Sequence, residues 1–254
     1  MESIVGQSFT TTTTTPRPTT PPVVYSCNKS SSCGCGQADV ALVSSRIVGG
    51  TDAVPHSWPM MVSVRFDGTN SHSCGGTVLS KSYILTAAHC FDRGSSQYVP
   101  GVSVAVGMTN RWDPLQTIRY VDRVYIHPNF SNITNDFQHD VALLHVNQSF
   151  EFTSNSNVSK TCIHRVDPPL LPDQYPSNGT RLAVIGWGTL QQSGSTLPLI
   201  LQQVQVFTID NDEEICQDSI ENPEIQFCAG LFEGGKGQYS IVYSTKYTYF
   251  SFMF

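Results

Sequence analysis

The sequence lacks the features of a membrane-spanning or nucleic-acid-binding chain. No apolar run reaches the length of about 18 residues that a transmembrane helix needs. Lysine and arginine number 14 against 20 acidic residues, the formal net charge is -6, and the basic residues form no cluster. We therefore expect no membrane span, and neither nucleic acid nor an anionic membrane surface as a partner.

Two further absences concern a leader peptide and helices. The first 22 residues, MESIVGQSFTTTTTTPRPTTPP, contain no apolar stretch like that of a secretory signal peptide. Helical periodicity is nearly absent, and only NDEEICQDSI at 211–220 favours a short helix. Short β-like runs separated by turn signals follow from Ile47 onward, among them WPMMVSVRF, YILTAAH, DVALLHV and RLAVIGWG. This spacing predicts an all-β barrel or sandwich.

Cysteines and glycosylation sequons both indicate an oxidising, extracellular destination. The chain has 8 cysteines, which favour a disulfide-forming compartment. The pattern Asn-x-Ser/Thr marks six of the twelve asparagines: Asn28, Asn129, Asn132, Asn147, Asn157 and Asn178. We expect a secreted glycoprotein whose N-terminus is incomplete as given, although sequons can also arise by chance in a chain rich in Ser and Thr.

His89 stands in LTAAHC, directly after a β-like run and directly before Cys90. Cys74 lies sixteen residues before Cys90, and a disulfide between them would fasten the loop that carries the histidine. Closing a loop of that size is worth about 3 kcal/mol in the chain-entropy model. Taken alone, His89 fits a catalytic base, a metal ligand or a satisfied core residue.

Asp140 stands at the head of the apolar run in HDVALLHV. A carboxylate that enters a core is costly unless it is paired. Imidazole is a natural partner, because the carboxylate holds the ring in one tautomer and stabilises its charged form. With His89 in the same chain, this interpretation outweighs an Asp that faces water, and it predicts a His89–Asp140 pair.

Arg46 and Ile47, in SSRIVGG, form a tryptic cleavage site followed by apolar residues and two glycines. Cleavage there would create an ammonium at Ile47 that could pair with a buried carboxylate. Together with the motifs above, SSRIVGG makes the chain resemble the chymotrypsin/trypsin-like serine protease family, over about residues 35–238. The motifs that carry the resemblance are, in order, RIVGG, SWPMMVSV, CGGTVL, LTAAHC, HPNF, HDVALL, IGWG and FCAG.

The resemblance implies the trypsin-like fold of two six-stranded Greek-key β-barrels. It implies that His89 is the general base, that Asp140 orients it, and that the bond after Arg46 is cut by an activating protease. Protein or peptide substrates are implied as well. The implied disulfides are Cys74–Cys90, Cys216–Cys228, Cys35–Cys162 and Cys27–Cys33, although Cys27, Cys33 and Cys35 could trade roles.

The chain departs from the family where the nucleophile should stand. Counting from Cys228 in the family's register places Tyr239, Ile241, Val242 and Tyr243 at the Cys, the oxyanion Gly, the Asp and the Ser. A phenol is not a base-activated serine, and Val242 offers Ile47 no counter-charge. Gly237 stands where trypsin-like members place the pocket Asp. We expect no metal and no cofactor, since GMTNRWDPLQTIRY lacks a Glu-rich calcium loop.

These observations divide the chain into four parts. We expect a Thr/Pro-rich segment and propeptide at 1–46, a first barrel at 47–165, a partial second barrel at 166–238 and an aromatic tail at 239–254. The tail has no Gly or Pro and is unlike the family, as a retained intron or a shifted frame would be. We expect it to stay loose and to promote aggregation, and we expect the second barrel to remain incomplete.

Two functions fit this reading. The first is a serine-type endopeptidase by family, truncated before the nucleophile and inactive in the form given. The alternative is a pseudoprotease that acts as a non-catalytic binding or decoy protein. Retention of both His89 and Asp140 weakly disfavours the alternative.

Overall fold

The structure of the chain is a computed structural model. It describes residues 23–26, 31–34, 36, 38–42, 50–91, 99–130, 138–153, 157–163, 176–190, 196–217, 220, 222–223, 226–233, 238–242 and 250–253.

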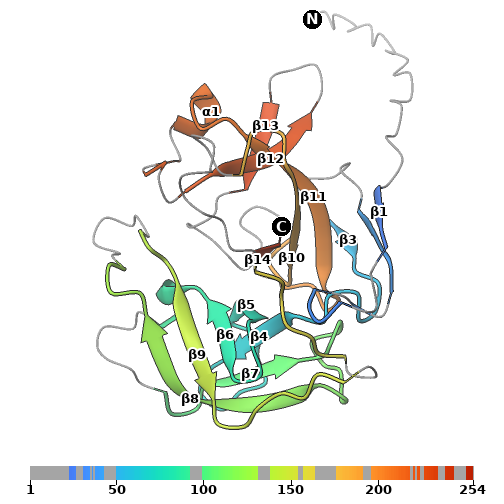
Figure 1. Cartoon of the computed structure of the whole chain (residues 1–254), viewed down its shortest axis with the longest axis vertical. Helices are drawn as coiled ribbons and strands as arrows, with labels where there is room; N and C mark the ends of the chain where they lie inside the picture. The colour runs from blue at the N-terminus through green and yellow to red at the C-terminus, as the bar shows by residue number, and fades with distance from the viewer. Residues whose placement is uncertain are drawn as a thin grey trace, which may run out of the picture.

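The first half of the chain forms a closed antiparallel barrel with the strand order β4-β5-β6-β9-β8-β7, which lies at the bottom of Figure 1. Buried and partly exposed residues alternate along β5 and β9, as expected for strands with one face turned to a core. The strands are β4 (Met61–Arg65), β5 (Cys74–Val78), β6 (Tyr83–Thr86), β7 (Ser103–Val106), β8 (Thr117–Ile126) and β9 (Ala142–Val146).

Apolar residues from all six strands fill the barrel. Val62, Val64, Ile84, Val104 and Leu144 are each fully buried there. The β-branched residues suit the pleated inner surface of a barrel, where their stiff side chains lose little freedom. The all-β fold class that the sequence predicts is thus confirmed, with a closed six-stranded barrel and very little helix.

A second, six-stranded sheet lies above the barrel in Figure 1 and has the path β13-β12-β11-β10-β14, with β3 also paired to β11. Within the described residues β13 and β14 are the two ends of this path, and the expected incompleteness of the second barrel stays a prediction. The strands are β3 (Thr51–Asp52), β10 (Arg181–Gly186), β11 (Gln202–Ile209), β12 (Cys228–Glu233), β13 (Gln238–Val242) and β14 (Phe250–Met253).

The tail from residue 239 differs from its expected loose state. Residues of β13 pair with β12 over the register Gly230↔Ile241, and β14 pairs with β10 over the register Val184↔Phe252. Pairing satisfies backbone groups along the two edges that β10 and β12 would otherwise expose. The expectation that this segment remains unpaired is therefore wrong for both of these strands.

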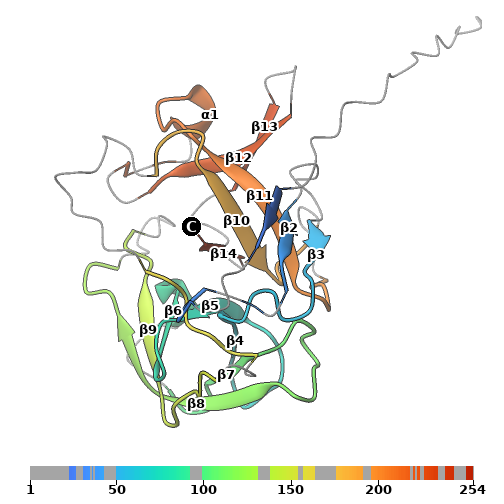
Figure 2. The same ribbon diagram turned by 45° about the vertical axis from the view of Figure 1, so that its right-hand side comes forward.

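The described part of the N-terminal segment packs against the body of the protein. Strands β1 (Val23–Tyr25) and β2 (Val40–Leu42) pair with each other, and β2 lies beside β11 (Figure 2). Val40 and Leu42 are buried in an apolar cluster that also contains Ile185 and Trp187. Strand β2 thus supplies part of the core between the barrel and the second sheet.

Helical structure is confined to two short turns in the described residues. The 3-10 helix η1 spans Ala88–Phe91, and α1 spans Glu214–Gln217 inside the stretch that the sequence predicts to be helical. Neither of them, nor any other described helix, has the length and apolarity required to cross a membrane.

Candidate active site

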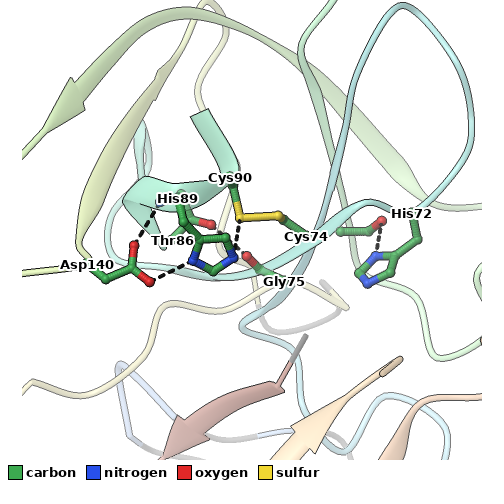
Figure 3. The surroundings of a disulfide bond; sticks show 8 residues. His72, Cys74, Gly75, Thr86, His89, Cys90 and Asp140 are labelled. Atoms are coloured by element: carbon green, nitrogen blue, oxygen red, sulfur yellow. Dashed lines mark hydrogen bonds and ion pairs between the residues drawn. A yellow bond between two sulfur atoms is a disulfide. The ribbon is translucent and has the colours of Figure 1, made fainter. Parts of the chain in front are cut away.

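His89 lies in η1, immediately after strand β6. Two contacts fix the end of β6 and this turn to strand β5 (Figure 3). The Thr86 hydroxyl donates a hydrogen bond to the Gly75 carbonyl at 2.7 Å, and a disulfide joins Cys74 to Cys90. The structure thus contains the Cys74–Cys90 bond that the sequence predicts, and this bond holds the histidine's turn against the barrel.

Asp140 lies two residues before β9, with its side chain 2% exposed. One carboxylate oxygen, Oδ1, accepts the backbone N–H of His89 at 2.8 Å, while Oδ2 lies 2.6 Å from His89 Nδ1. Both oxygens therefore bind the same residue, one through its backbone and one through its ring (Figure 3). The structure brings together the two side chains that the sequence predicts to pair.

The geometry fixes the orientation and the tautomer of the His89 ring. Because a carboxylate can only accept a hydrogen bond, an ionised Asp140 places the ring proton on Nδ1. The lone pair then lies on Nε2, the atom that a general base uses to take a proton. The His89 side chain is 25% exposed, which leaves the ring accessible at the barrel surface. The pair therefore has the arrangement of a general base with its orienting carboxylate.

A metal ion is a poor fit to the same cluster. The ligand atoms of Cys74, His89 and Cys90 lie within 4.8 Å of one another, and His89 Nε2 is 3.7 Å from Cys90 Sγ. Metal ions bind thiolates, but both sulfurs are joined to each other in a disulfide. A single imidazole remains as a ligand, which does not make a metal site.

The tether between the N-terminal segment and the barrel differs from the prediction. The structure joins Cys33 to Cys162, so the predicted pairs Cys35–Cys162 and Cys27–Cys33 are wrong. Between Cys33 and Cys35, Gly34 adopts φ +76° and donates its N–H to the Lys160 carbonyl at 2.8 Å. A Cβ atom at Gly34 would lie 2.9 Å from Cys162 Sγ, so the chain can turn past this sulfur only at a glycine.

The structure describes some of the remaining predicted sites and leaves others outside the described residues. Cys216 and Cys228 are joined as predicted. The sequon residues Asn129, Asn147 and Asn178 are exposed, and Asn157 is half-buried. The other predicted positions lie outside the described residues: Cys27, Asn28, Cys35, Arg46, Ile47, Asn132, Gly237 and Tyr243.

Sequence reasoning missed a buried cationic region near the barrel surface. Arg65 is 1% exposed, and its hydrogen bonds go to neutral acceptors, the shortest being Gln116 Oε1 at 2.7 Å. His72 is 4% exposed, with Nδ1 2.8 Å from the Ser63 hydroxyl. Burial, followed by the charges of Arg111 and Arg65, lowers the pKa of His72 to about 4. His72 is therefore neutral in the folded protein at pH 7.

Sequence reasoning also missed a pair of histidines next to the site. The rings of His127 and His139 stack with their centroids 4.8 Å apart, and His139 directly precedes Asp140. Both histidines stand in motifs that are visible in the sequence, HPNF and QHDVALL. Nothing in the sequence alone shows that the two rings meet.

Comparisons with known proteins agree with this fold and this site. The Trypsin family model matches residues 47–239. Trypsin-1 of Astacus astacus is 33% identical over 198 residues, which cover 75% of this chain and 77% of that protein. The chain therefore belongs to the trypsin-like serine proteases, a family of hydrolases.

Two further relatives and one solved structure support the assignment. The chain is 32% identical to serine proteinase stubble of Drosophila melanogaster over 80% of its own length, but it spans only 25% of that relative. Chymotrypsin-C of Mus musculus is 33% identical over 64% of this chain and 57% of that protein. One solved structure is that of neuropsin, a serine protease expressed in the limbic system of mouse brain. It matches with a TM-score of 0.58 at 23% identity, over 77% of this chain and 82% of the neuropsin chain. That structural likeness bears on the fold alone.

Proposed function

We propose that this chain carries the base half of a serine-type endopeptidase site without its nucleophile, and that in the form given it does not cleave peptide bonds. One observation carries the proposal: both oxygens of Asp140 bind His89, through the ring at 2.6 Å and through the backbone at 2.8 Å. In a complete site, His89 would take the proton of a serine hydroxyl, and Asp140 would stabilise the imidazolium that forms.

The segment at the nucleophile position supports the absence of turnover. In the family's register Tyr243 replaces the serine, and a phenol is not activated in its place. Ser240, Ile241 and Val242 lie in β13 and pair with β12. Backbone amides in a strand ladder alternate in direction, whereas an oxyanion hole needs amides that converge on one point. Ser240 is thus a poor substitute nucleophile.

The finer features of a secreted zymogen are part of the same proposal. Exposed sequons at Asn129, Asn147 and Asn178 and a disulfide-bonded frame favour a glycosylated extracellular protein. An activating protease would cut after Arg46, and Val242 would leave the new Ile47 ammonium without the carboxylate that the family provides. Protein or peptide chains are the expected ligands of such a barrel.

The β13 ladder also favours a second candidate, a pseudoprotease that binds a protein without cleaving it. A fluorophosphonate probe distinguishes activity from its absence, because it labels only an activated serine. The full chain is treated with immobilised trypsin, separated from it and then incubated with the probe, with a competent trypsin-like enzyme as the positive control. We expect no label on the chain, and label that disappears in His89→Ala would overturn the proposal. Binding of a peptide ligand without turnover would favour the second candidate.

A further inference from the structure

Asp140 is held by a short segment that packs against residues after β8. The backbone N–H of His127 donates to the Val141 carbonyl at 2.9 Å, and the Val141 N–H donates to the His139 carbonyl at 2.7 Å. The segment that follows β8 and the segment that precedes β9 therefore run together directly beside Asp140. The position of Asp140 depends on how firmly these two segments are joined.

Side chains join the two segments at the same point. The imidazoles of His127 and His139 are stacked, with 7° between the ring planes. His127 Nδ1 also accepts the N–H of Asn129 at 3.2 Å, which fixes the ring against its own backbone. His139 adopts φ +52°, a left-handed conformation that L residues other than glycine rarely hold without support.

We propose that the stacked pair His127–His139 is a positioning device for Asp140. His139 is covalently next to Asp140, so its φ angle determines the direction in which the Asp140 backbone leaves the turn. The stack supports that φ angle because the His139 ring packs against the His127 ring, whose Nδ1 is bonded to the Asn129 N–H. Neither histidine touches the reacting atoms, and both act through Asp140. The inference deepens the proposed role of the His89–Asp140 pair but does not require the chain to cleave a peptide.

The demand on position is strict because Asp140 makes two bonds in different directions. Oδ1 must reach the His89 backbone and Oδ2 must reach the ring at the same time. A small rotation of the Asp140 backbone would lengthen one of these bonds even if the other survived. The backbone N–H of His89 therefore reports the placement of Asp140 directly, without any substrate.

The test uses the full chain labelled with 15N-histidine, in which all 7 histidines are visible. It measures the solvent exchange of the His89 backbone N–H and the resonance of its Nδ1 proton. His127→Ala removes the stack and the acceptor for Asn129, while His139→Asn removes the ring but tolerates a positive φ. Loss of a hydrogen bond to a charged group should speed His89 N–H exchange by about tenfold or more in both variants. His127→Phe keeps a ring for stacking and should restore slow exchange.

His56→Ala is the matched control, because His56 also has a positive φ, of 58°, and its backbone N–H bonds the Thr109 hydroxyl at 2.8 Å rather than a residue of the site. It should leave His89 exchange unchanged, as should the internal reference His145, which bonds Asp122 at 2.6 Å on the outside of the barrel. Unchanged His89 exchange in both stack variants would overturn the proposal. Equal acceleration at His72 and His145 would also overturn it, because that result means general destabilisation of the barrel. If His127→Ala does not fold, His139→Asn decides alone.

Discussion

Removal of the Cys33–Cys162 bond should release the N-terminal segment once the chain is cut after Arg46. Before cleavage, this bond closes a loop of sequence separation 129, which corresponds to about 5 kcal/mol in the chain-entropy model. After cleavage the bond becomes the covalent link between the two pieces. Whether they stay together without it depends on what else holds the segment.

The other attachments across the cleaved bond are few. Val40 and Leu42 are buried, and burial of two such side chains contributes about 3 to 6 kcal/mol. The Ala41 carbonyl accepts a hydrogen bond from Gln203 Nε2 at 3.2 Å and the Gly34 N–H donates another at 2.8 Å, which add about 1 kcal/mol each. Association of two separate chains costs about 4 kcal/mol at the least and considerably more by other estimates. These values nearly cancel, so the segment should dissociate at micromolar concentration.

The assay is size-exclusion chromatography of the trypsin-cleaved chain with mass spectrometry of each fraction. The wild type should elute as one disulfide-linked species, and Cys33→Ser/Cys162→Ser should lose the N-terminal segment. Cys216→Ser/Cys228→Ser removes a bond that lies outside this tether and is the matched control, so its segment should be retained. Co-elution of the segment with the body in Cys33→Ser/Cys162→Ser would refute the reasoning. Release on Cys35→Ser but not on Cys33→Ser would show that the pairing itself is wrong.

The burial of His72, the close approach at Gly34 and the pairing of β13 and β14 lead to three further predictions. Burial lowers the pKa of His72 to about 4, so between that pH and about 6.5 the unfolded chain binds more protons than the folded protein does. The free energy of unfolding is therefore higher at neutral pH and decreases on acidification. The wild type should therefore lose about 2 to 3 kcal/mol more than His72→Gln between pH 7.5 and pH 4.5 in urea unfolding, and equal losses would contradict this. Gly34→Ala should prevent Cys33–Cys162 from forming, because the new Cβ would crowd Cys162 Sγ; a non-reducing peptide map showing the bond intact would contradict it. Deletion of residues 239–254 removes β14 and most of β13, so it should lower the melting temperature and raise light scattering, whereas an equally stable and soluble product would show that the strands contribute little.

The β-rich fold and the His89–Asp140 pair could be predicted from the sequence because their signals are local, whereas the choice of a barrel over a sandwich came from the family resemblance. Alternation in CGGTV and ALLHV gives the faces of β5 and β9, and the paired β6 and β9 bring their flanking residues close together. His89 follows β6 and Asp140 precedes β9. Since these two strands are antiparallel neighbours, the end of one meets the start of the other. The site is thus a consequence of one strand pairing.

The features that sequence reasoning missed depend on details that strand patterns do not encode. Cys33 and Cys35 are equivalent by spacing, and the choice between them depends on the positive φ of Gly34 beside Lys160. The strands β13 and β14 pair with edges that their own residues do not specify. The contact between His127 and His139 depends on a left-handed residue directly before Asp140. Each of these is set by tertiary context rather than by periodicity.

The two halves of the proposed site have different structural origins. His89 and Asp140 are positioned by β6, β9 and a disulfide that all belong to the closed barrel. By register the family's oxyanion glycine falls at Ile241 in β13, which belongs to the other sheet, and the nucleophile falls at Tyr243, outside the described residues. A change confined to that segment can therefore remove the nucleophile while the base and its carboxylate stay in place. Asp140 also accepts the backbone N–H of His89 in the turn that η1 forms, so it has a structural role in the barrel beside its contact with the imidazole ring.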